Sequence, residues 1–252
     1  MIGVFDSGVG GLSVLVEVRR RLPGADLLYV ADRARAPYGT KPIEVVESMS
    51  HEVAAWLLAR GATCLVVACN TASAAALDSL RLVHPGTPIV GMEPAVKPAA
   101  AGTASGRVAV FATAVTFQGR LFASVVDRFA EGVEVLTYAC PEWVELVEEG
   151  VVEGTEAEHA VAAALEPAME AGADRIVLAC THFSFLRPLI ERVGDIPVID
   201  PAPAVAQQVE RVAPEPTGGG GTVLAVSGDA SGFNELAHRL AGVSGTVIPF
   251  AP

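Results

Sequence analysis

Residues 61–69 read G-A-T-C-L-V-V-A-C and residues 172–180 read G-A-D-R-I-V-L-A-C, so the chain contains one short pattern twice. In both stretches an apolar run with the length of a buried strand ends at a cysteine, Cys69 or Cys180. Small polar residues follow each cysteine at once. The repeat predicts two buried strands that carry a cysteine at the same end.

Two further pairs of segments flank this repeat in the same order. I-G-V-F-D-S-G at 2–8 parallels V-A-V-F-A-T-A at 108–114, and T-P-I-V-G-M-E-P-A at 87–95 parallels I-P-V-I-D-P-A-P-A at 196–204. The offset is 106 residues from 2 to 108, 111 from 61 to 172 and 109 from 87 to 196. A period of this length exceeds that of solenoid repeats. It predicts two similar α/β halves.

Short β-branched runs alternate with longer Ala-, Leu- and Glu-rich segments, which is typical of α/β folds with mainly parallel sheets. The pattern predicts strands at 2–5, 27–31, 64–68, 88–91, 108–112, 133–137, 175–179, 197–199, 223–227 and 246–249. It predicts helices at 11–22, 42–60, 73–84, 117–130, 142–149, 156–171, 185–193, 203–211 and 231–241, and a Pro- and Gly-rich loop at 214–221.

The repeat predicts two pseudo-symmetric α/β domains with the active site in the cleft between them. We expect residues 1–95 plus 205–252 to form the first domain and residues 96–204 the second. Ligands of open α/β sheets bind beyond the carboxyl ends of the strands. Two such domains facing each other would bring Cys69 and Cys180 to opposite sides of one cleft.

Composition limits the partners of this 252-residue chain. Hydrophobic residues make up 51%, and the net charge is −12, whereas nucleic acids and anionic membranes bind basic patches. No apolar run approaches the ~20 residues that span a bilayer, and no secretory signal is recognisable. We therefore expect a cytoplasmic protein that contacts neither nucleic acid nor membrane.

Four cysteines without a C-x-x-C pair favour free thiols over disulfides or a structural zinc site. Cys69 and Cys180 facing one another suit a two-base proton exchange, in which one thiolate removes a proton from a carbon and the other thiol delivers one to the opposite face. A pair of structural cysteines, redox or nucleophilic chemistry, and a metal site that includes His182 are the alternatives. Pyridoxal phosphate is not expected, because Lys41 and Lys97 lie outside the polar strand ends.

Polar residues near both cysteines strengthen the proton-exchange hypothesis. Asp6 ends the first strand, and His182 follows Cys180 by two residues, so each could assist one cysteine. Further residues lie in turns that open helices, where backbone N–H groups attract anions. They are Ser7 with the glycines of D-S-G-V-G-G, Asn70, Thr71 and Thr181. The D-S-G-V-G-G loop lacks the Gly-Lys-Ser/Thr ending of a nucleotide-binding loop.

Several motifs together resemble those of glutamate racemases. They are I-G-V-F-D-S-G-V-G-G-L-S-V, A-P-Y-G-T-K, V-V-A-C-N-T-A-S-A, C-P-E-W-V-E-L-V-E-E-G and A-C-T-H-F, and they cover most of the chain. The resemblance implies a cofactor-independent isomerase that interconverts L- and D-glutamate and supplies D-glutamate for peptidoglycan. It also implies a homodimer.

The resemblance further implies roles for individual residues. Cys69 and Cys180 would be the acid/base pair, with Asp6, His182 and Glu148 as assistants, although Glu149 leaves the last assignment open by one residue. The substrate contacts implied are Asp6, Ser7, Tyr38, Gly39, Asn70, Thr71, Thr181 and His182. A racemase of aspartate or another amino acid, and a non-catalytic regulatory homologue, remain alternatives.

Overall fold

The fold is that of a computed structural model, which describes residues 1–215 and 218–251. Its strands form a six-stranded sheet in the order β10-β9-β2-β1-β3-β4 and a four-stranded sheet in the order β6-β5-β7-β8. Every strand pair is parallel. The strands are β1 (Ile2–Asp6), β2 (Leu27–Ala31), β3 (Cys64–Val67), β4 (Ile89–Gly91), β5 (Arg107–Ala112), β6 (Glu134–Ala139), β7 (Arg175–Ala179), β8 (Val198–Ile199), β9 (Thr222–Val226) and β10 (Thr246–Pro249).

The internal repeat reappears in the order and register of the strands. The order β2-β1-β3-β4 in the first sheet corresponds to β6-β5-β7-β8 in the second. Ile2 pairs with Cys64 across β1 and β3, and Val108 pairs with Arg175 across β5 and β7, as the offsets of 106 and 111 require. The predicted α/β fold with two parallel sheets is therefore confirmed.

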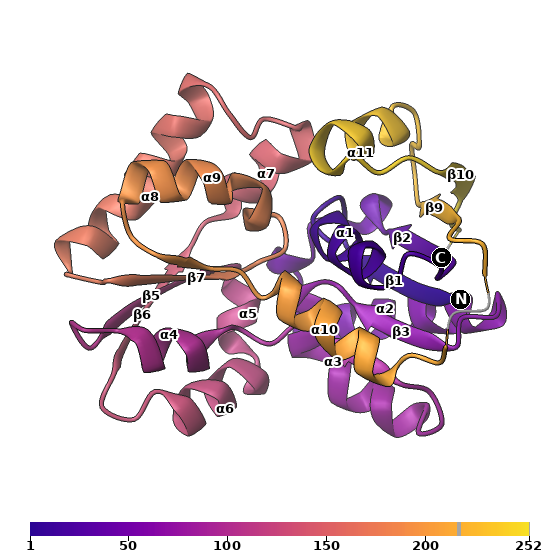
Figure 1. Ribbon diagram of the computed structural model, residues 1–252, viewed down its shortest axis with the longest axis horizontal. Coiled ribbons are helices and arrows are strands. Elements are labelled where there is room, and N and C mark those ends of the chain that lie inside the picture. The colour runs from indigo at the N-terminus through magenta and orange to yellow at the C-terminus, as the bar shows by residue number, and fades with distance from the viewer. Residues whose placement is uncertain (216–217, 252) are drawn as a thin grey trace.

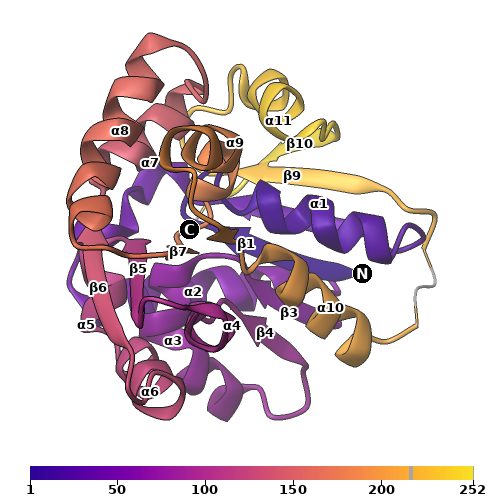
Figure 2. The same cartoon turned by 60° about the vertical axis from the view of Figure 1, so that its left-hand side comes forward.

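Helices cover both faces of each sheet, and the two halves lie side by side (Figures 1 and 2). Apolar packing places α1, α10 and α11 on one face of the first sheet and α2 and α3 on the other. In the second half α7, α8 and α9 cover one face, and α4 and α6 the other. Their bounds are α1 (Leu12–Arg21), α2 (Ile43–Ala59), α3 (Asn70–Val83), α4 (Val96–Gly102), α5 (Ala114–Gln118), α6 (Arg120–Phe129), α7 (Pro141–Glu149), α8 (Thr155–Glu170), α9 (Phe183–Gly194), α10 (Ala202–Val212) and α11 (Phe233–Ala241), with 3₁₀ turns η1 (Arg33–Arg35) and η2 (Tyr38–Thr40).

One hydrophobic cluster continues from the first half into the second. It joins the α1, α10 and α11 side of the first sheet to the α7, α8 and α9 side of the second. Side chains alternate between sheet faces, so Val4 lies in this cluster while the next residue, Phe5, packs toward α2 and α3. Cys180 lies in the shared cluster, whereas Cys69 belongs to the α2 and α3 side.

Two segments differ from the sequence-based expectation. The predicted helix at 117–130 is divided into α5 and α6 by Gly119, where a Cβ would lie 2.7 Å from the Cβ of Ala74 on α3. Helix α4 was not among the predicted helices. Pro98 is the third residue of this helix, where its missing N–H is not needed. Residues 216–217 of the predicted loop lie outside the described residues.

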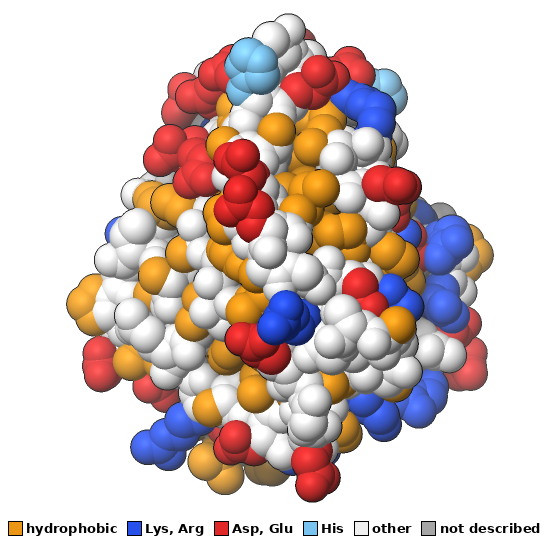
Figure 3. All heavy atoms as spheres, turned by 90° about the vertical axis from the view of Figure 1, so that its left-hand side faces the viewer, with side chains coloured by type: hydrophobic (Ala, Val, Ile, Leu, Met, Phe, Trp, Pro, Cys, Tyr) orange, Lys and Arg blue, Asp and Glu red, His pale blue; other side chains and the backbone are white. Residues whose placement is uncertain are grey.

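The surface of the second half carries charges of both signs. On the face in Figure 3 acidic side chains gather toward the upper left, and Lys and Arg side chains lie mostly toward the right and lower edges. Among the described helices, none combines the length and the apolar composition that a membrane span needs.

The domain limits expected from the repeat stay a prediction. Strands β9 and β10, from the C-terminal part of the chain, belong to the first sheet.

Candidate active site

The two cysteines occupy equivalent positions just beyond the carboxyl ends of β3 and β7. Cys69 is the N-cap of α3, and its Sγ accepts a hydrogen bond from the backbone N–H of Ala72 at 3.4 Å. Cys180 lies between β7 and the start of α9. Strand β3 adjoins β1, and β7 adjoins β5, so both cysteines lie where the strand order reverses, the usual place for a ligand in such sheets.

A pocket of about 190 Å³ contains both thiols. Both cysteines are buried, with exposed fractions of 5% for Cys69 and 7% for Cys180. The pocket gathers residues from both halves and includes all but two of the predicted site residues. Its lining is Ser7, Pro37, Tyr38, Gly39, Thr40, Cys69, Asn70, Thr71, Thr113, Ala114, Ala139, Pro141, Val144, Glu145, Cys180, Thr181 and His182.

Asp6 is fully buried and is not among the residues that line the pocket. Its Oδ1 accepts a hydrogen bond from the N–H of Gly8 at 2.8 Å, and its Oδ2 accepts one from the Thr181 hydroxyl at 3.1 Å. Burial raises the pKa of Asp6 above its usual value. The carboxylate therefore bridges the loop after β1 and the loop after β7, in addition to acting on Cys69 through its charge.

A chain of contacts runs from Cys180 to Glu148. His182 Nδ1 lies 3.7 Å from Cys180 Sγ, and His182 Nε2 donates to Glu148 Oε1 at 2.7 Å. Glu149 is exposed, so the structure brings Glu148 and not Glu149 to the histidine. His182 thus has one nitrogen on the thiol and the other on a carboxylate.

This arrangement changes the titration of both groups. Burial opposes the charge of His182, but its hydrogen bonds with Cys180 and Glu148 hold the pKa of the imidazole well above its usual value. Burial also opposes ionisation of Glu148, yet the hydrogen bond and charge of His182 and the N–H of Val9 lower the pKa of this carboxyl. A charged carboxylate therefore fixes the ring that faces Cys180.

The pKa of Cys69 shifts in one clear direction. Burial is the largest cause, and the nearby carboxylate of Asp6 adds to it, so the pKa of this thiol is raised. Hydrogen bonds from the backbone N–H groups of Ala72 and Ser7 only partly offset these effects. The raised pKa favours the protonated thiol of Cys69 at neutral pH.

The glycine loop after β1 differs from the anion-binding loop that its composition suggested. Its N–H groups at Gly8 and Val9 already bind the protein's own carboxylates, Asp6 Oδ1 and Glu148 Oε1, each at 2.8 Å. The loop's glycines serve close contact with the second half: a Cβ on Gly8 would lie 1.8 Å from Glu148 Oε1. The loop therefore joins the two halves behind the pocket.

The side chain of Asn70 lines the pocket without a hydrogen-bond partner. It is 4% exposed, and both Oδ1 and Nδ2 are unpaired within the described residues. A buried amide without partners costs about 1–3 kcal/mol, so such groups in a native site usually await a ligand or water. Asn70 is thus the clearest sign that a polar molecule belongs in this pocket.

Tyr38, Gly39 and Thr71 are predicted site residues that line the pocket from the first half of the chain. Tyr38 is buried, and its hydroxyl donates to Asp32 Oδ2, which fixes the turn that carries Gly39. The Thr71 hydroxyl pairs with that of Thr113 at 2.9 Å. Thr113 was not predicted, although the offset of 106 makes it the counterpart of Ser7 and could have identified it.

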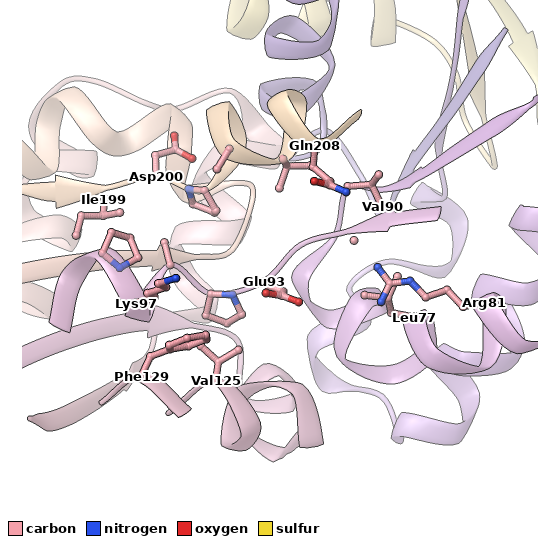
Figure 4. Close-up of a pocket in the computed structure, with 17 residues that line it drawn as sticks. Leu77, Arg81, Val90, Glu93, Lys97, Val125, Phe129, Ile199, Asp200 and Gln208 are labelled. Carbon is pink, nitrogen blue, oxygen red and sulfur yellow. The ribbon is translucent and has the colours of Figure 1, made fainter. Parts of the chain in front are cut away.

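A larger cavity of about 540 Å³ lies away from this site (Figure 4). The segments after β4 and β8, which connect the two sheets, provide much of its lining, including Glu93, Lys97 and Asp200. None of the described residues that line it is a predicted site residue. The predicted residues thus gather around the smaller pocket with the two cysteines.

Comparison with known proteins agrees with this geometry. The family model described as Asp/Glu/Hydantoin racemase matches residues 10–209. The chain belongs to this racemase family. A glutamate racemase of Roseiflexus sp. (strain RS-1) is 48% identical over 248 residues, which cover 95% of this chain and 91% of that protein. The predicted resemblance and the predicted class, an amino-acid racemase, are confirmed.

Solved racemase structures share the whole fold. The glutamate racemase isoform RacE1 from Bacillus anthracis has a TM-score of 0.88 at 29% identity, covering 100% of this chain and 97% of that one. The Escherichia coli glutamate racemase, in complex with L-glutamate and the activator UDP-MurNAc-Ala, has a TM-score of 0.87 at 30% identity, covering 99% and 97%. This racemase therefore has the two-domain α/β architecture of its relatives.

Asp6→Asn is expected to stabilise the racemase at neutral pH while it lowers the activity. The raised pKa means that ionised Asp6 costs stability above its unfolded value of 3.8, and the amide removes that cost. The amide can still accept from Gly8 N and donate to Thr181 Oγ1. Thermal unfolding should show a gain of roughly 2–4 °C per kcal/mol at pH 7. Because Asp6 is protonated in both states at low pH, a gain that persists well below pH 3.8 would contradict this cause.

Proposed function

We propose that this enzyme interconverts L- and D-glutamate without a cofactor, using Cys69 and Cys180 as its two bases. One observation carries the proposal: the two thiols follow equivalent strands of a repeated fold and line one pocket together. A ligand between them would present opposite faces of its α-carbon to the two sulfurs. Inversion at carbon needs this arrangement, since the proton leaves one face and arrives at the other.

In the proposed mechanism one cysteine, as thiolate, removes the α-proton and leaves a carbanion adjacent to the carboxylate. The opposite thiol then donates its proton to the other face, so the first cysteine ends as thiol and the second as thiolate. The reverse reaction exchanges these roles. Cys69, with its raised pKa, enters as the thiol, and Cys180, whose Sγ lies 3.7 Å from His182 Nδ1, acts as the base in that direction. Burial of both sulfurs keeps water away from the carbanion.

Neutral donors would bind the carboxylates of the amino acid. The described lining contains no Lys or Arg, so the carboxylates would depend on backbone N–H groups at the starts of α3 and α9 and on hydroxyl groups. The unpaired amide of Asn70 supplies a further donor and an acceptor. We assign substrate contact to the lining residues Ser7, Tyr38, Gly39, Asn70, Thr71, Thr181 and His182. Asp6 would act indirectly, through the hydrogen bond that it accepts from Thr181.

Glutamate is favoured over aspartate by the relatives. The Roseiflexus protein is named a glutamate racemase at 48% identity, and so is a protein of Pseudomonas paraeruginosa that is 51% identical over 213 residues. The Escherichia coli structure contains L-glutamate. We further propose that the D-glutamate formed enters peptidoglycan synthesis, that the enzyme acts as a homodimer, and that its domains are residues 1–95 plus 205–252 and residues 96–204.

The proposal is tested by incubating the purified enzyme separately with L-glutamate and with L-aspartate in deuterium oxide. Circular dichroism follows racemisation, and proton NMR follows exchange at the α-carbon. We expect glutamate to lose its optical activity and its α-proton without added cofactor, and aspartate to react far more slowly. Loss of neither signal from glutamate would reject the enzyme. Faster turnover of aspartate would reject the substrate assignment.

A further inference from the structure

Glu148 joins three segments that are distant in the sequence. Its Oε1 accepts hydrogen bonds from His182 Nε2 at 2.7 Å and from the Val9 N–H at 2.8 Å. Its Oε2 faces Arg33 Nε at 3.4 Å. Arg33 lies in the η1 turn of the first half, whereas Glu148 belongs to α7 of the second. The carboxylate that supports His182 is therefore itself held by a cation from the opposite half.

Arg33 is kept in position by the C-terminal part of the chain. Its guanidinium carbon lies 5.8 Å from the ring centre of Phe233, a fully buried residue at the start of α11. The turn that carries Arg33 is fixed by Ser227, which accepts a hydrogen bond from Ala34 N at 2.9 Å and donates one to Asp32 Oδ1 at 2.8 Å. These partners lie beyond residue 209, where the match to the family model ends.

Among the described residues, no comparable cation is in direct contact with the carboxylate on the Cys69 side. Both oxygens of Asp6 accept hydrogen bonds from neutral donors, Gly8 N and Thr181 Oγ1. On the Cys180 side, by contrast, Arg33 contributes to the lowered pKa of Glu148. An effect of Arg33 on the chemistry should therefore appear at one cysteine and not at the other.

We propose that Arg33 is a positioning residue that holds Glu148 against His182 and thereby supports proton transfer at Cys180. This role deepens the proposed racemisation and rests on it. Arg33 touches neither thiol and does not line the cysteine pocket. It lines a second cavity, which shares His182 with that pocket and also contains Glu148 and Asp229. Residues that follow β9 and begin α11 would thus affect the reactivity of Cys180 through Arg33, Glu148 and His182.

The test compares Arg33→Gln with Arg33→Lys and with Arg239→Gln as a matched control. Arg239 also contacts the end of α7, but it donates to the backbone oxygen of Glu149 at 3.1 Å and leaves Glu148 untouched. Both glutamine variants remove one positive charge near the same helix. Thermal unfolding of all variants identifies any general loss of structure before the chemistry is compared.

The readout is the alkylation rate of each cysteine by iodoacetamide, resolved by mass spectrometry of peptides, together with kcat/KM for glutamate. In Arg33→Gln we expect Cys180 to react about fivefold more slowly relative to Cys69, the effect that one partly exposed ion pair supports. Arg33→Lys should recover most of the ratio, and Arg239→Gln should keep it. An unchanged ratio, or an equal change in Arg239→Gln, would overturn the proposal. The ratio of the alkylation rates of Cys180 and Cys69 can be measured without substrate turnover. It therefore tests the proposal even if glutamate proves not to be the substrate.

Discussion

Cys69→Ser and Cys180→Ser are each expected to reduce the rate of racemisation by about 10²–10⁴-fold, which is the contribution of one positioned acid/base group. A serine hydroxyl is a far weaker acid than a thiol, so it can neither form the base nor supply the proton at neutral pH. The pocket should otherwise persist, because serine is similar in size to cysteine. Circular dichroism with L- and D-glutamate measures the loss.

Exchange of the α-proton should distinguish the two variants. Each variant retains one working cysteine, which reaches one face of the α-carbon. Each should therefore exchange the α-proton of one enantiomer in deuterium oxide without racemising it, and the two variants should select opposite enantiomers. Cys64→Ala is the control, since Cys64 is buried at the amino end of β3, away from the pocket. Near-normal racemisation by either serine variant would remove that cysteine from the mechanism.

Gly10→Ala is expected to reduce kcat/KM by about 10²-fold, because it displaces the histidine that faces Cys180. A Cβ on Gly10 would lie 2.3 Å from His182 Nδ1 and 2.6 Å from Thr181 Oγ1, closer than Cβ atoms approach other heavy atoms. The imidazole must move, and the nitrogen that contacts Cys180 Sγ moves with it. Displacements of about 1 Å have effects of this size on catalysis.

Gly86→Ala provides the matched control for this substitution. No atom lies within 4 Å of a Cβ at Gly86, so alanine should leave the activity unchanged. It should be neutral for stability or increase the free energy of unfolding by about 0.4–1 kcal/mol through the unfolded chain. Initial rates and thermal unfolding of both variants give the comparison. A folded Gly10→Ala variant with the wild-type kcat/KM would show that the position of His182 does not limit the reaction.

The sequence predicted the strands better than the contacts between the halves. Each predicted strand overlaps one in the structure, because short β-branched runs between helical segments have few other stable arrangements. The choice between Glu148 and Glu149 remained open, since one residue turns a side chain by about 100° around a helix. Only the packing of α7 brings Glu148 to His182 and leaves Glu149 exposed.

Contacts between residues of the two halves could not be predicted from sequence patterns either. The role of Asp6 as an assistant of Cys69 stays a prediction, and its hydrogen bond with Thr181 in the other half was not predicted. Likewise, the loop at Gly8 suggested an anion site for a ligand, whereas its N–H groups hold carboxylates of the protein. Such pairs depend on how the two sheets meet, and no local periodicity encodes that geometry.

The sequence alone determined the repeated fold and the positions of the two cysteines, because hydrophobic periodicity and strand ends are local properties of the chain. The tertiary structure alone decided which polar groups touch: Arg33 with Glu148, Glu148 with His182, and Asp6 with Thr181. These contacts join residues from 34 to 175 positions apart in the chain. They form only when burial of the shared hydrophobic cluster brings the two halves together.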